Sequence, residues 1–444
     1  MKPSPAMFRA HREKFLAKLP PNSIAILRAA PLRVMSNDVE YLYRQDSDFW
    51  YLTGIEDSEA IVVLRPNAAD GKKYVVFVKP RERRLESYEG PKVGPAEAAS
   101  AFGADAAFSL EEFGERLSRF DDPLEAEKVF LSDGGDAEWA ETLRKRIALL
   151  KSRDGSASPV VDAREVIHEM RVVKDADEIA LIRRATEISG RGHVLAMKAA
   201  APGRYEFEVQ AALDGYCAAN GVRRMAYPSI AASGPNSVFL HWDRNDRQLQ
   251  DGDVVLNDSG AEYGYYATDV TRTYPASGRF SAEQRAIYDV VLAAQKAAMA
   301  QIRPGVAFDR AGAAAARVQT EGLVKLGLLS GDVEKLLSES GYRVFTKHAI
   351  SHWVGLDVHD AGGYSAGTAS RPLEPGMVFT VEPGIYVGAD PGVDRKWWNI
   401  GVRIEDMVVV TDAGYECLSC FVPREAGEVE KTVLSGRATE GQKR

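Results

Sequence analysis

Cysteine is scarce in this sequence, with 3 residues among 444. So small and odd a number offers no framework of disulfides and favours a reduced, cytoplasmic protein. Cys417 and Cys420 form a C-x-x-C pair in a strand-like segment, whereas a redox pair is expected at the start of a helix. Residues i and i+3 of a strand lie on opposite faces, and a zinc site would need a second pair where only Cys217 remains. We therefore expect both cysteines to be ordinary structural residues.

Long apolar runs and an excess of positive charge are also missing. No stretch reaches the roughly 20 apolar residues of a membrane-spanning helix. Residues 1–20 carry charges every few positions and lack the apolar centre of a secretory signal. Asp and Glu number 64 against 56 Lys and Arg, a net charge of −8, whereas nucleic-acid binding needs a basic face. We expect neither a membrane nor a nucleic acid as a partner.

The first part of the chain alternates between strand-like and helix-like segments. Apolar runs rich in β-branched residues predict strands, at 24–27, 60–64 and 74–78. Polar amphipathic stretches predict helices, at 111–120 and 137–150. The polar stretch 151–159 predicts an exposed loop and a domain boundary just beyond it. We expect a mixed α/β (α+β) protein with one domain at 1–170 and a second at 171–444.

The second part of the chain contains an internal repeat of paired helices. An Asp or Ser followed three residues later by Glu or Gln predicts a capped helix start, and this pattern occurs at Asp175 with Glu178 and at Ser281 with Gln284. Each of these helices is expected to stop at a Pro-Gly pair. A second amphipathic helix follows each stop, at 206–219 and 308–326.

The strands of the second part repeat in the same way. Aligning Gly252 with Gly376 places Asp258 opposite Glu382, and each of these carboxylates follows a short apolar run. Helix pairs followed by strands, twice, predict two pseudo-symmetric halves around one central site.

Five side chains with metal-binding atoms stand out in this region: Asp258, Asp269, His352, Glu382 and Glu405. Carboxylates at the ends of apolar strands are costly to bury unless something neutralises them. Four carboxylates and one imidazole converging on one cavity would form a divalent-metal site, and so much negative charge calls for two ions. Oxygen-rich ligand sets favour Mn²⁺ or Mg²⁺ over zinc, and we expect two Mn²⁺ ions.

The flanks of these residues read DVVLNDSG, YATDVTRTYP, HAISHWVGLDVHD, MVFTVEPGIY and GVRIEDMVVV. They resemble the ligand motifs of the metallopeptidase family that contains aminopeptidase P, prolidase and methionine aminopeptidase. Residues 41–64 resemble part of the N-terminal domain of bacterial aminopeptidase P. The resemblance implies an aminopeptidase P-like domain at 1–170 and a catalytic domain with the pita-bread fold at 171–444.

The resemblance also implies a role for each ligand. Asp269 and Glu405 would bridge the two ions, Asp258 would bind one of them, and His352 with Glu382 would bind the other. Glu382 is also implied as the general base. His241 and His359 are implied as catalytic hydrogen-bonding groups. Further substrate contacts are implied for His348, Asp38, Arg153 and Arg371, and for Tyr88, where bacterial relatives place a tryptophan contributed to a neighbouring subunit's site.

Two more candidates follow from spacing alone. Arg403 lies two residues before Glu405 and would share its face on a strand, where it would orient a ligand or neutralise excess charge. Tyr386 lies four residues after Glu382 and is expected either to hydrogen-bond near the same carboxylates or to be a core residue.

An H-E-x-x-H zinc protease is a different interpretation of His348 and His352. Position 349 is alanine, so the glutamate of that motif is missing, and the segment after His352 has the character of turn and strand. We therefore reject this interpretation.

The resemblance implies an Xaa-Pro aminopeptidase that removes the residue before a proline in peptides, in a homo-oligomer (a tetramer or a dimer). A prolidase, which cleaves only Xaa-Pro dipeptides with the same metals, is the alternative. A methionine aminopeptidase would not need some 170 residues before the catalytic domain, and a metal-free relative acting on guanidino compounds would have lost the ligands. A more remote alternative is an inactive, peptidase-like binding module.

Overall fold

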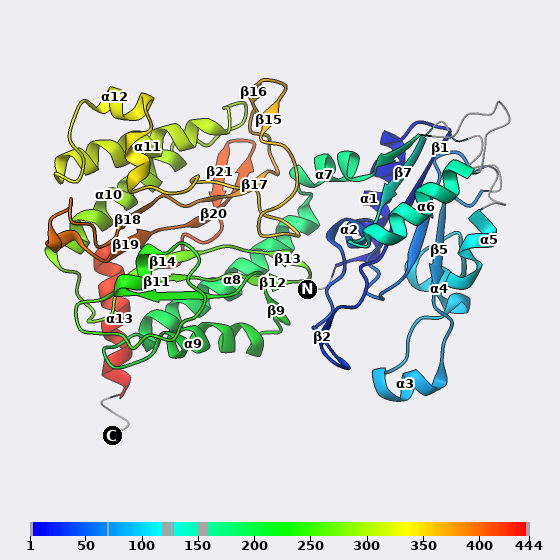
Figure 1. Ribbon diagram of the computed structural model, residues 1–444, viewed down its shortest axis with the longest axis horizontal. Helices are drawn as coiled ribbons and strands as arrows, with labels where there is room; N and C mark the ends of the chain where they lie inside the picture. Colours follow the sequence, from blue (N-terminus) through cyan, green and yellow to red (C-terminus); the bar gives the residue numbers. More distant parts are fainter. Residues whose placement is uncertain (1–2, 69–70, 118–125, 127, 150–158, 441–444) are drawn as a thin grey trace. The chain divides into compact units, whose positions relative to one another are not determined.

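The computed structural model describes residues 3–68, 71–117, 126, 128–149 and 159–440. The chain folds as two compact units, Lys2–Met170 and Arg171–Arg444. Both units combine helices and strands (Figure 1). The loop expected at 151–159 lies outside the described residues, except for Pro159.

A six-stranded mixed sheet forms the centre of the N-terminal unit, in the order β6-β5-β4-β1-β7-β8. Its strands, in that order, are Ala106–Ser109, Tyr74–Val78, Ile61–Leu64, Ser23–Arg28, Lys128–Ser132 and Val160–Asp162. The three strands expected from the sequence are confirmed as β1, β4 and β5. In each strand, every second residue points to the same face of the sheet. The apolar side chains on one face, among them Ile26, Val63 and Phe77, therefore lie in one buried cluster.

Helices flank this sheet, and a short hairpin extends from the same unit. The helices are α1 (Pro5–Lys18), α2 (Ser47–Thr53), α3 (Arg83–Glu89), α4 (Pro95–Phe102), α5 (Phe113–Leu117), α6 (Ala137–Leu149) and α7 (Arg164–Val172), which continues into the second unit. The hairpin pairs β2 (Val34–Ser36) with β3 (Val39–Glu40). The expected helix at 137–150 is confirmed as α6. At 111–120 the structure has a short 3₁₀ turn, η1 (Leu110–Glu112), followed by α5, and residues 118–120 lie outside the described part.

The predicted helix repeat is present in the C-terminal unit. Helix α8 (Ala176–Ala199) packs against α9 (Glu206–Ala219), and α10 (Ala282–Met299) packs against α11 (Asp309–Lys325). The first helix of each pair starts with a capping box, at Asp175 and at Ser281, as the sequence indicates. Figure 1 shows the two pairs on opposite sides of the strands of this unit.

The strands between the helix pairs form small antiparallel sheets. One sheet contains β10 (Ile230–Ser233), β11 (Val254–Asp258) and β14 (Thr271–Pro275), and its counterpart contains β17 (Val378–Val381), β20 (Asp406–Thr411) and β21 (Gly414–Cys417). A ribbon of β18 (Gly384–Val387) and β19 (Ile400–Arg403) leads from β17 to β20. The remaining strands are β9 (Arg224–Met225), β12 (Ala261–Tyr263), β13 (Tyr266–Ala267), β15 (Ser365–Ala366) and β16 (Ala369–Ser370).

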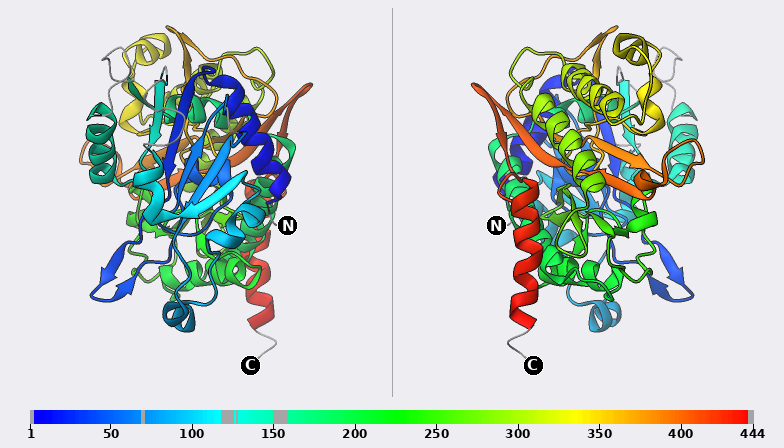
Figure 2. Two further views of the ribbon diagram at one scale, coloured as in Figure 1. Left: turned by 90° about the vertical axis from the view of Figure 1, so that its right-hand side faces the viewer. Right: turned by 90° about the vertical axis from the view of Figure 1, so that its left-hand side faces the viewer.

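Shorter helices complete this unit: η2 (Gly234–Val238), α12 (Val333–Ser338), η3 (Gly341–Val344) and η4 (Arg395–Trp397). Helix α13 (Ala426–Glu440) packs against α8 and β14. Figure 2 shows it in red on the C-terminal unit.

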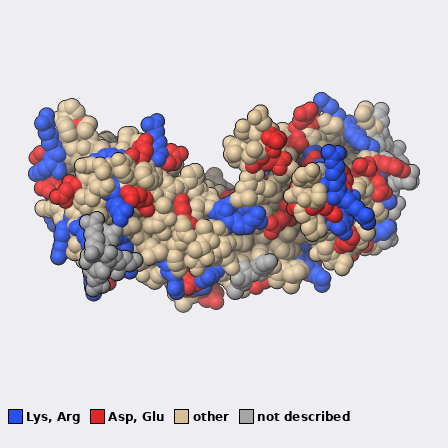
Figure 3. All heavy atoms as spheres, turned by 90° about the horizontal axis from the view of Figure 1, so that it is seen from below, with Lys and Arg blue, Asp and Glu red and all other residues tan. Residues whose placement is uncertain are grey.

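Two further properties are the length of the apolar helices and the distribution of charge on the surface. Among the residues described, no helix is both long enough and apolar enough to cross a membrane. On the face drawn in Figure 3, Lys and Arg side chains are interspersed with Asp and Glu side chains.

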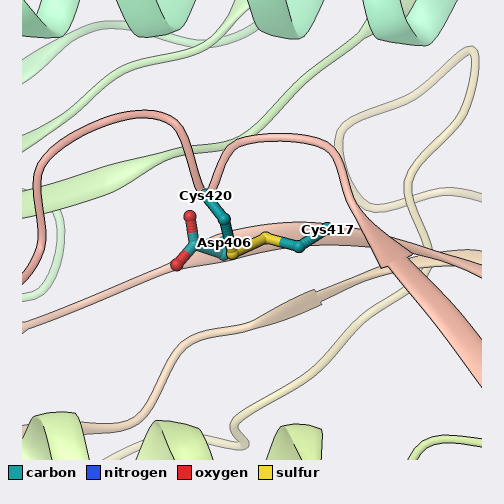
Figure 4. A group of neighbouring side chains, drawn as sticks. All are labelled: Asp406, Cys417 and Cys420. Carbon is teal, nitrogen blue, oxygen red and sulfur yellow. A yellow bond between two sulfur atoms is a disulfide. The ribbon is translucent and has the colours of Figure 1, made fainter.

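The structure corrects our interpretation of Cys417 and Cys420. A disulfide joins them, with their Cα atoms 5.6 Å apart, a normal separation for this bond. Cys417 is the last residue of β21, and the chain turns directly after it. Strand alternation therefore does not extend to Cys420. Figure 4 shows the pair beside Asp406.

Asp406 and the two cysteines lie close enough to suggest a metal site. The two sulfur atoms, however, are bonded to each other. The carboxylate of Asp406 pairs with Arg272 at 2.7 Å and with Arg424 at 2.9 Å. This group is therefore a structural element rather than a ligand set.

Candidate metal centre

The first two carboxylates of the centre are positioned by neighbouring antiparallel strands. Asp258 is the last residue of β11, and its register partner on β14 is Thr271. Asp269 lies two residues before Thr271, so it reaches the end of β11 where Asp258 lies. Burial of the apolar residues of β11 holds this strand end inside the unit.

The second half of the repeat supplies the other two carboxylates. Glu382 directly follows β17, and Glu405 directly precedes β20. Val381 and Asp406 are register partners, so both glutamates lie at the same end of this sheet. The amide of Glu405 donates to the carbonyl of Thr271 at 3.1 Å, and this bond joins the two halves of the repeat at the centre.

His352 is held against the edge of β17. Its amide donates to Thr380 Oγ1 at 3.1 Å, and the amide of Thr380 donates to the carbonyl of His352 at 3.0 Å. The imidazole Nε2 lies 3.4 Å from Asp269 Oδ2 and 3.3 Å from Glu382 Oε1. Ligand atoms of Asp269, His352 and Glu405 lie within 4.8 Å of one another. The segment 346–352 is not helical, which agrees with our rejection of a zinc-protease helix.

A cavity of about 350 Å³ contains the whole set. All five predicted ligands line it, together with His241, His348, His359 and Arg403. A second cavity of about 360 Å³ shares Asp258, Asp269, His241 and His359 with the first. The two exposed histidines, 241 and 359, therefore stand where the cavities meet.

The electrostatics of the carboxylates call for cations. Burial, and then the neighbouring Glu405, raises the pKa of Glu382 to about 8. Burial, and then the charge of Asp258, raises the pKa of Asp269 well above its usual value. Burial and the neighbouring Asp269 do the same for the pKa of Glu405. A buried cluster that resists carrying its full negative charge is matched by divalent ions, so the residues present fit the metals expected.

Asp258 differs from the other three carboxylates. Burial alone would raise its pKa, but Arg403 and the hydroxyl of Tyr227 lower it below the usual value. Arg403 Nη2 donates to Asp258 Oδ2 at 2.5 Å. The Tyr227 hydroxyl lies 2.5 Å from Oδ1 of Asp258 and 2.5 Å from Oδ1 of Asp269, so its single proton is shared between the two carboxylates. The site thus keeps one carboxylate ionised through contacts of its own.

A hydrogen-bonded chain leads from Arg403 to His348. Arg403 Nη1 donates to the Tyr386 hydroxyl at 2.8 Å, and this hydroxyl lies 2.7 Å from His348 Nε2. His348 Nδ1 lies 2.7 Å from the carbonyl of Ala349. A carbonyl only accepts, so Nδ1 carries the proton and Nε2 accepts from Tyr386. Burial, and then Arg403, lowers the pKa of His348 to about 4, which keeps this ring neutral.

His359 and His352 pack edge to face, with ring centroids 4.3 Å apart. Burial, and then the neighbouring His352, lowers the pKa of His359. His359 is followed by Asp360, which is buried and pairs with Lys174 Nζ at 2.9 Å and with Arg171 Nη2 at 2.5 Å. These two ion pairs fix the end of the segment that carries His359.

Four further residues were predicted to contact the substrate. Arg371 is half-buried and its backbone pairs with Phe308 and Tyr364, but its side chain does not line the central cavity. Asp38 is exposed between β2 and β3, and Tyr88 of α3 is 82% exposed. Arg153 lies outside the described residues. Substrate contacts by these four residues stay predictions.

Sequence reasoning missed three polar residues of the site. Tyr227 bonds to two candidate ligands, Thr271 Oγ1 donates to Glu405 Oε2 at 2.7 Å, and Tyr364 lines the cavity. Thr271 is the first residue of β14 and Asp269 precedes that strand, so strand alternation did not indicate that the two side chains share a face. Tyr227 and Tyr364 lie in turn-rich segments where no periodicity indicates the direction of a side chain.

Comparisons with known proteins agree with this geometry. Residues 180–412 match the model of metallopeptidase family M24, and residues 8–129 match that of the aminopeptidase P N-terminal domain. The Xaa-Pro aminopeptidase of Escherichia coli K12 is 38% identical over 436 residues, which cover 97% of this chain and 98% of that protein. The Xaa-Pro aminopeptidase of Haemophilus influenzae is also 38% identical, over 95% and 96% of the two chains.

Solved structures are similar over the same length. The structure of Pseudomonas aeruginosa aminopeptidase PepP matches with a TM-score of 0.94 and 40% identity, over 98% of this chain and 99% of that one. Zn-substituted Escherichia coli aminopeptidase P in complex with product matches with a TM-score of 0.92 and 36% identity, over 98% and 99%. The chain therefore belongs to metallopeptidase family M24 and, within it, to the aminopeptidase P group. The predicted fold is confirmed.

Proposed function

We propose that this protein is an Xaa-Pro aminopeptidase that uses two divalent ions to hydrolyse the peptide bond before a proline in the second position. The observation that carries the proposal is one cavity lined by all five predicted ligands and by three further histidines. The similarity to Xaa-Pro aminopeptidases over nearly the whole chain supports it.

The ligand assignment follows the resemblance to the ligand motifs of the family, and the positions of the carboxylates support it. Asp269 and Glu405 lie where the two halves of the repeat meet, and we assign them as the bridging ligands. Asp258 would hold one ion, and His352 with Glu382 would hold the other. When bound, such ions lower the pKa of a water nucleophile and polarise the scissile carbonyl. We propose Mn²⁺ as the native metal, because the donor set is rich in oxygen.

The side chains around the ligands would then carry out the proton and charge chemistry. Glu382 accepts the proton of the attacking water at a carboxylate oxygen. His241 and His359 donate hydrogen bonds to the carbonyl oxygen as it gains negative charge. Arg403 keeps Asp258 ionised, and that carboxylate is available to pair with the free α-amine of the peptide.

The substrate class follows from what the cavity presents. Proline removes the amide N–H next to the bond, so a peptidase that relies on a backbone acceptor loses a hydrogen bond. A cavity lined by imidazoles does not depend on that N–H. A site that places the free α-amine beside Asp258 and the prolyl imide beside the histidines would select peptides that begin with Xaa-Pro.

The test compares four peptides with Mn²⁺ present: Ala-Pro-Ala, N-acetyl-Ala-Pro-Ala, Ala-Ala-Ala and Ala-Pro. We expect rapid cleavage of Ala-Pro-Ala, none of its acetylated form, and weak cleavage of Ala-Ala-Ala. Cleavage of Ala-Pro but not of Ala-Pro-Ala would assign the chain to prolidase instead. Rapid hydrolysis of Ala-Ala-Ala would remove the proline specificity. Failure to bind two equivalents of metal would favour an inactive binding module.

We further propose residues 1–170 as the aminopeptidase P-like domain and 171–444 as the catalytic domain, which the matches at 8–129 and 180–412 support. A homo-oligomer is proposed, and light scattering of the purified protein tests it. A cytoplasmic location is proposed as well. Separating cell compartments by fractionation and detecting the protein in each fraction tests this location.

A further inference from the structure

Glu206 is a buried carboxylate that none of the steps above uses. It is the first residue of α9, and its side chain is 0% exposed. Its Oε1 accepts from the amide of Ser233 at 2.6 Å, from Ser233 Oγ at 2.7 Å and from Asn236 Nδ2 at 2.9 Å. Its Oε2 accepts from Trp242 Nε1 and from the amide of Arg247, each at 3.0 Å. Five donors therefore converge on one side chain.

All five donors belong to the segment 233–247. This segment leaves β10, passes through η2 and returns towards α9, and residues 239–246 have no regular secondary structure. The amide of Glu206 also donates to the carbonyl of Arg247 at 3.0 Å. A segment without ladder hydrogen bonds of its own needs partners elsewhere for its polar groups, and Glu206 supplies them at both ends and in the middle.

His241 lies inside this segment, between Asn236 and Trp242. Its ring is exposed, and within the described part of the chain no hydrogen bond holds its side chain. The direction of the ring is therefore set by the backbone that carries it. The opposite side of the segment is tied to the site, because Arg403 Nη2 approaches the carbonyl of Leu240 at 3.4 Å.

We infer that Glu206 is a positioning residue that holds the segment 233–247 so that His241 projects into the cavity. This inference rests on the proposed role of His241. Glutamine is a sharp probe of it, because an amide replaces one acceptor oxygen by a donor nitrogen. Donors face both oxygens of Glu206, so either orientation of the amide would place N–H groups against other donors.

The experiment compares Glu206→Gln with Glu208→Gln, a change at a partly exposed glutamate two residues along the same helix. Hydrogen exchange followed by mass spectrometry, over peptides covering 229–247, reports the amides of Ser233 and Arg247. We expect Glu206→Gln to speed their exchange by about tenfold or more, as a lost hydrogen bond does, and Glu208→Gln to leave it unchanged. This readout does not depend on activity or on the substrate.

Kinetics on Ala-Pro-Ala then test the link to His241. We expect Glu206→Gln to lower kcat by about 10²-fold, the loss also predicted for His241→Ala, while metal content and KM stay near those of the wild type. The double variant with His241→Ala should be no slower than His241→Ala alone, because both changes remove the same interaction. Multiplied losses in the double variant, or loss of metal, would overturn the inference.

A milder change keeps the test decisive if Glu206→Gln does not fold. Trp242→Phe removes one donor and leaves the carboxylate, and it should lower kcat by a smaller factor that disappears in the His241→Ala background. Unchanged exchange and unchanged kcat in Trp242→Phe would overturn the inference. If the wild type does not cleave Xaa-Pro peptides, the proposed function fails, whereas the exchange data still report whether Glu206 holds the segment.

Discussion

Arg403 donates through Nη2 to Oδ2 of Asp258 over 2.5 Å, and the two residues are only 3% and 8% exposed. The same guanidinium reaches the Tyr386 hydroxyl through Nη1. The planar guanidinium makes these contacts from two separate nitrogens in a fixed fork, a geometry that the single nitrogen of lysine does not offer. Arg403 therefore sets the charge of a candidate metal ligand and, through Tyr386, the hydrogen bonding of His348.

Arg403→Lys is expected to lower kcat/KM for Ala-Pro-Ala by about 10²-fold, because small displacements of positioned groups cost this much. Steady-state kinetics at saturating Mn²⁺ measure the effect. Arg285→Lys, an exposed arginine of α10, is the matched control and should behave as the wild type. A kcat/KM within threefold of the wild type would show that positive charge alone is sufficient at position 403.

Asp269→Asn and Glu405→Gln should each abolish activity. Each carboxylate is assigned to both ions, so its loss should empty or displace the pair rather than raise KM alone. Peptidase assays together with elemental analysis of the bound metal measure both quantities. Asp289→Asn, at an exposed position of α10, serves as control. Near wild-type turnover in either ligand variant would rule out a dinuclear centre bridged by these residues.

His359→Ala and His241→Ala should keep both metals and lose turnover. A hydrogen bond made mainly in the transition state contributes about 10²–10³ in kcat. The measurement pairs kcat with metal content for each variant. Loss of metal in proportion to the loss of activity would mean that these histidines are ligands or structural residues.

Tyr227→Phe should weaken metal binding by about 10- to 100-fold, the usual effect of removing a partner that orients ligands. Its hydroxyl holds Asp258 and Asp269 in a common orientation. Titration of the metal-free protein with Mn²⁺ measures the affinity. Tyr274 of β14 is a suitable control, because its buried hydroxyl has no hydrogen-bond partner in the described structure. The role assigned to Tyr227 is wrong if Tyr227→Phe and Tyr274→Phe bind metal equally well.

Asp360→Asn should destabilise the protein in a pH-dependent way. Burial would raise the pKa of Asp360, but Arg171 and Lys174 lower it to about 2. Because the folded-state pKa lies below the unfolded value of about 3.9, the carboxylate adds about 2 kcal/mol of stability that is complete above about pH 5 and is lost as the pH falls towards 2.

Thermal unfolding between pH 8 and pH 2 measures this effect. The difference in Tm between the wild type and Asp360→Asn should be constant from pH 8 to pH 5 and should shrink below pH 4. A difference that shrinks already between pH 8 and pH 6 would mean that another group titrates with Asp360.

Local signals in the sequence predicted helix boundaries well. The helix expected at 206–219 is α9, residue for residue, and both capping boxes form as expected. Such signals depend on hydrogen bonds between residues three or four positions apart, which the sequence displays directly. The internal repeat also indicated where the site lies. Two symmetric halves around one centre bring their equivalent strand ends, with Asp258 and Glu382, to the same place.

Contacts between distant side chains could not be predicted in this way. Tyr227 approaches Asp258 and Asp269 only through the folding of a turn, and the partners of Asp360 are Arg171 and Lys174, some 190 residues earlier in the sequence. The disulfide was missed for a related reason. The end of β21 falls at Cys417, and strand periodicity carries no information beyond the end of the strand.

The repeat divides the candidate ligands between its halves. Asp258 and Asp269 come from the first half, whereas His352, Glu382 and Glu405 come from the second. A growing chain therefore cannot assemble the centre until Glu405 has been synthesised, however early the metal is present. Metal binding would therefore require that both halves of the repeat have folded and packed together. Degradation of metal-free chains would then remove proteins in which the two halves have not packed.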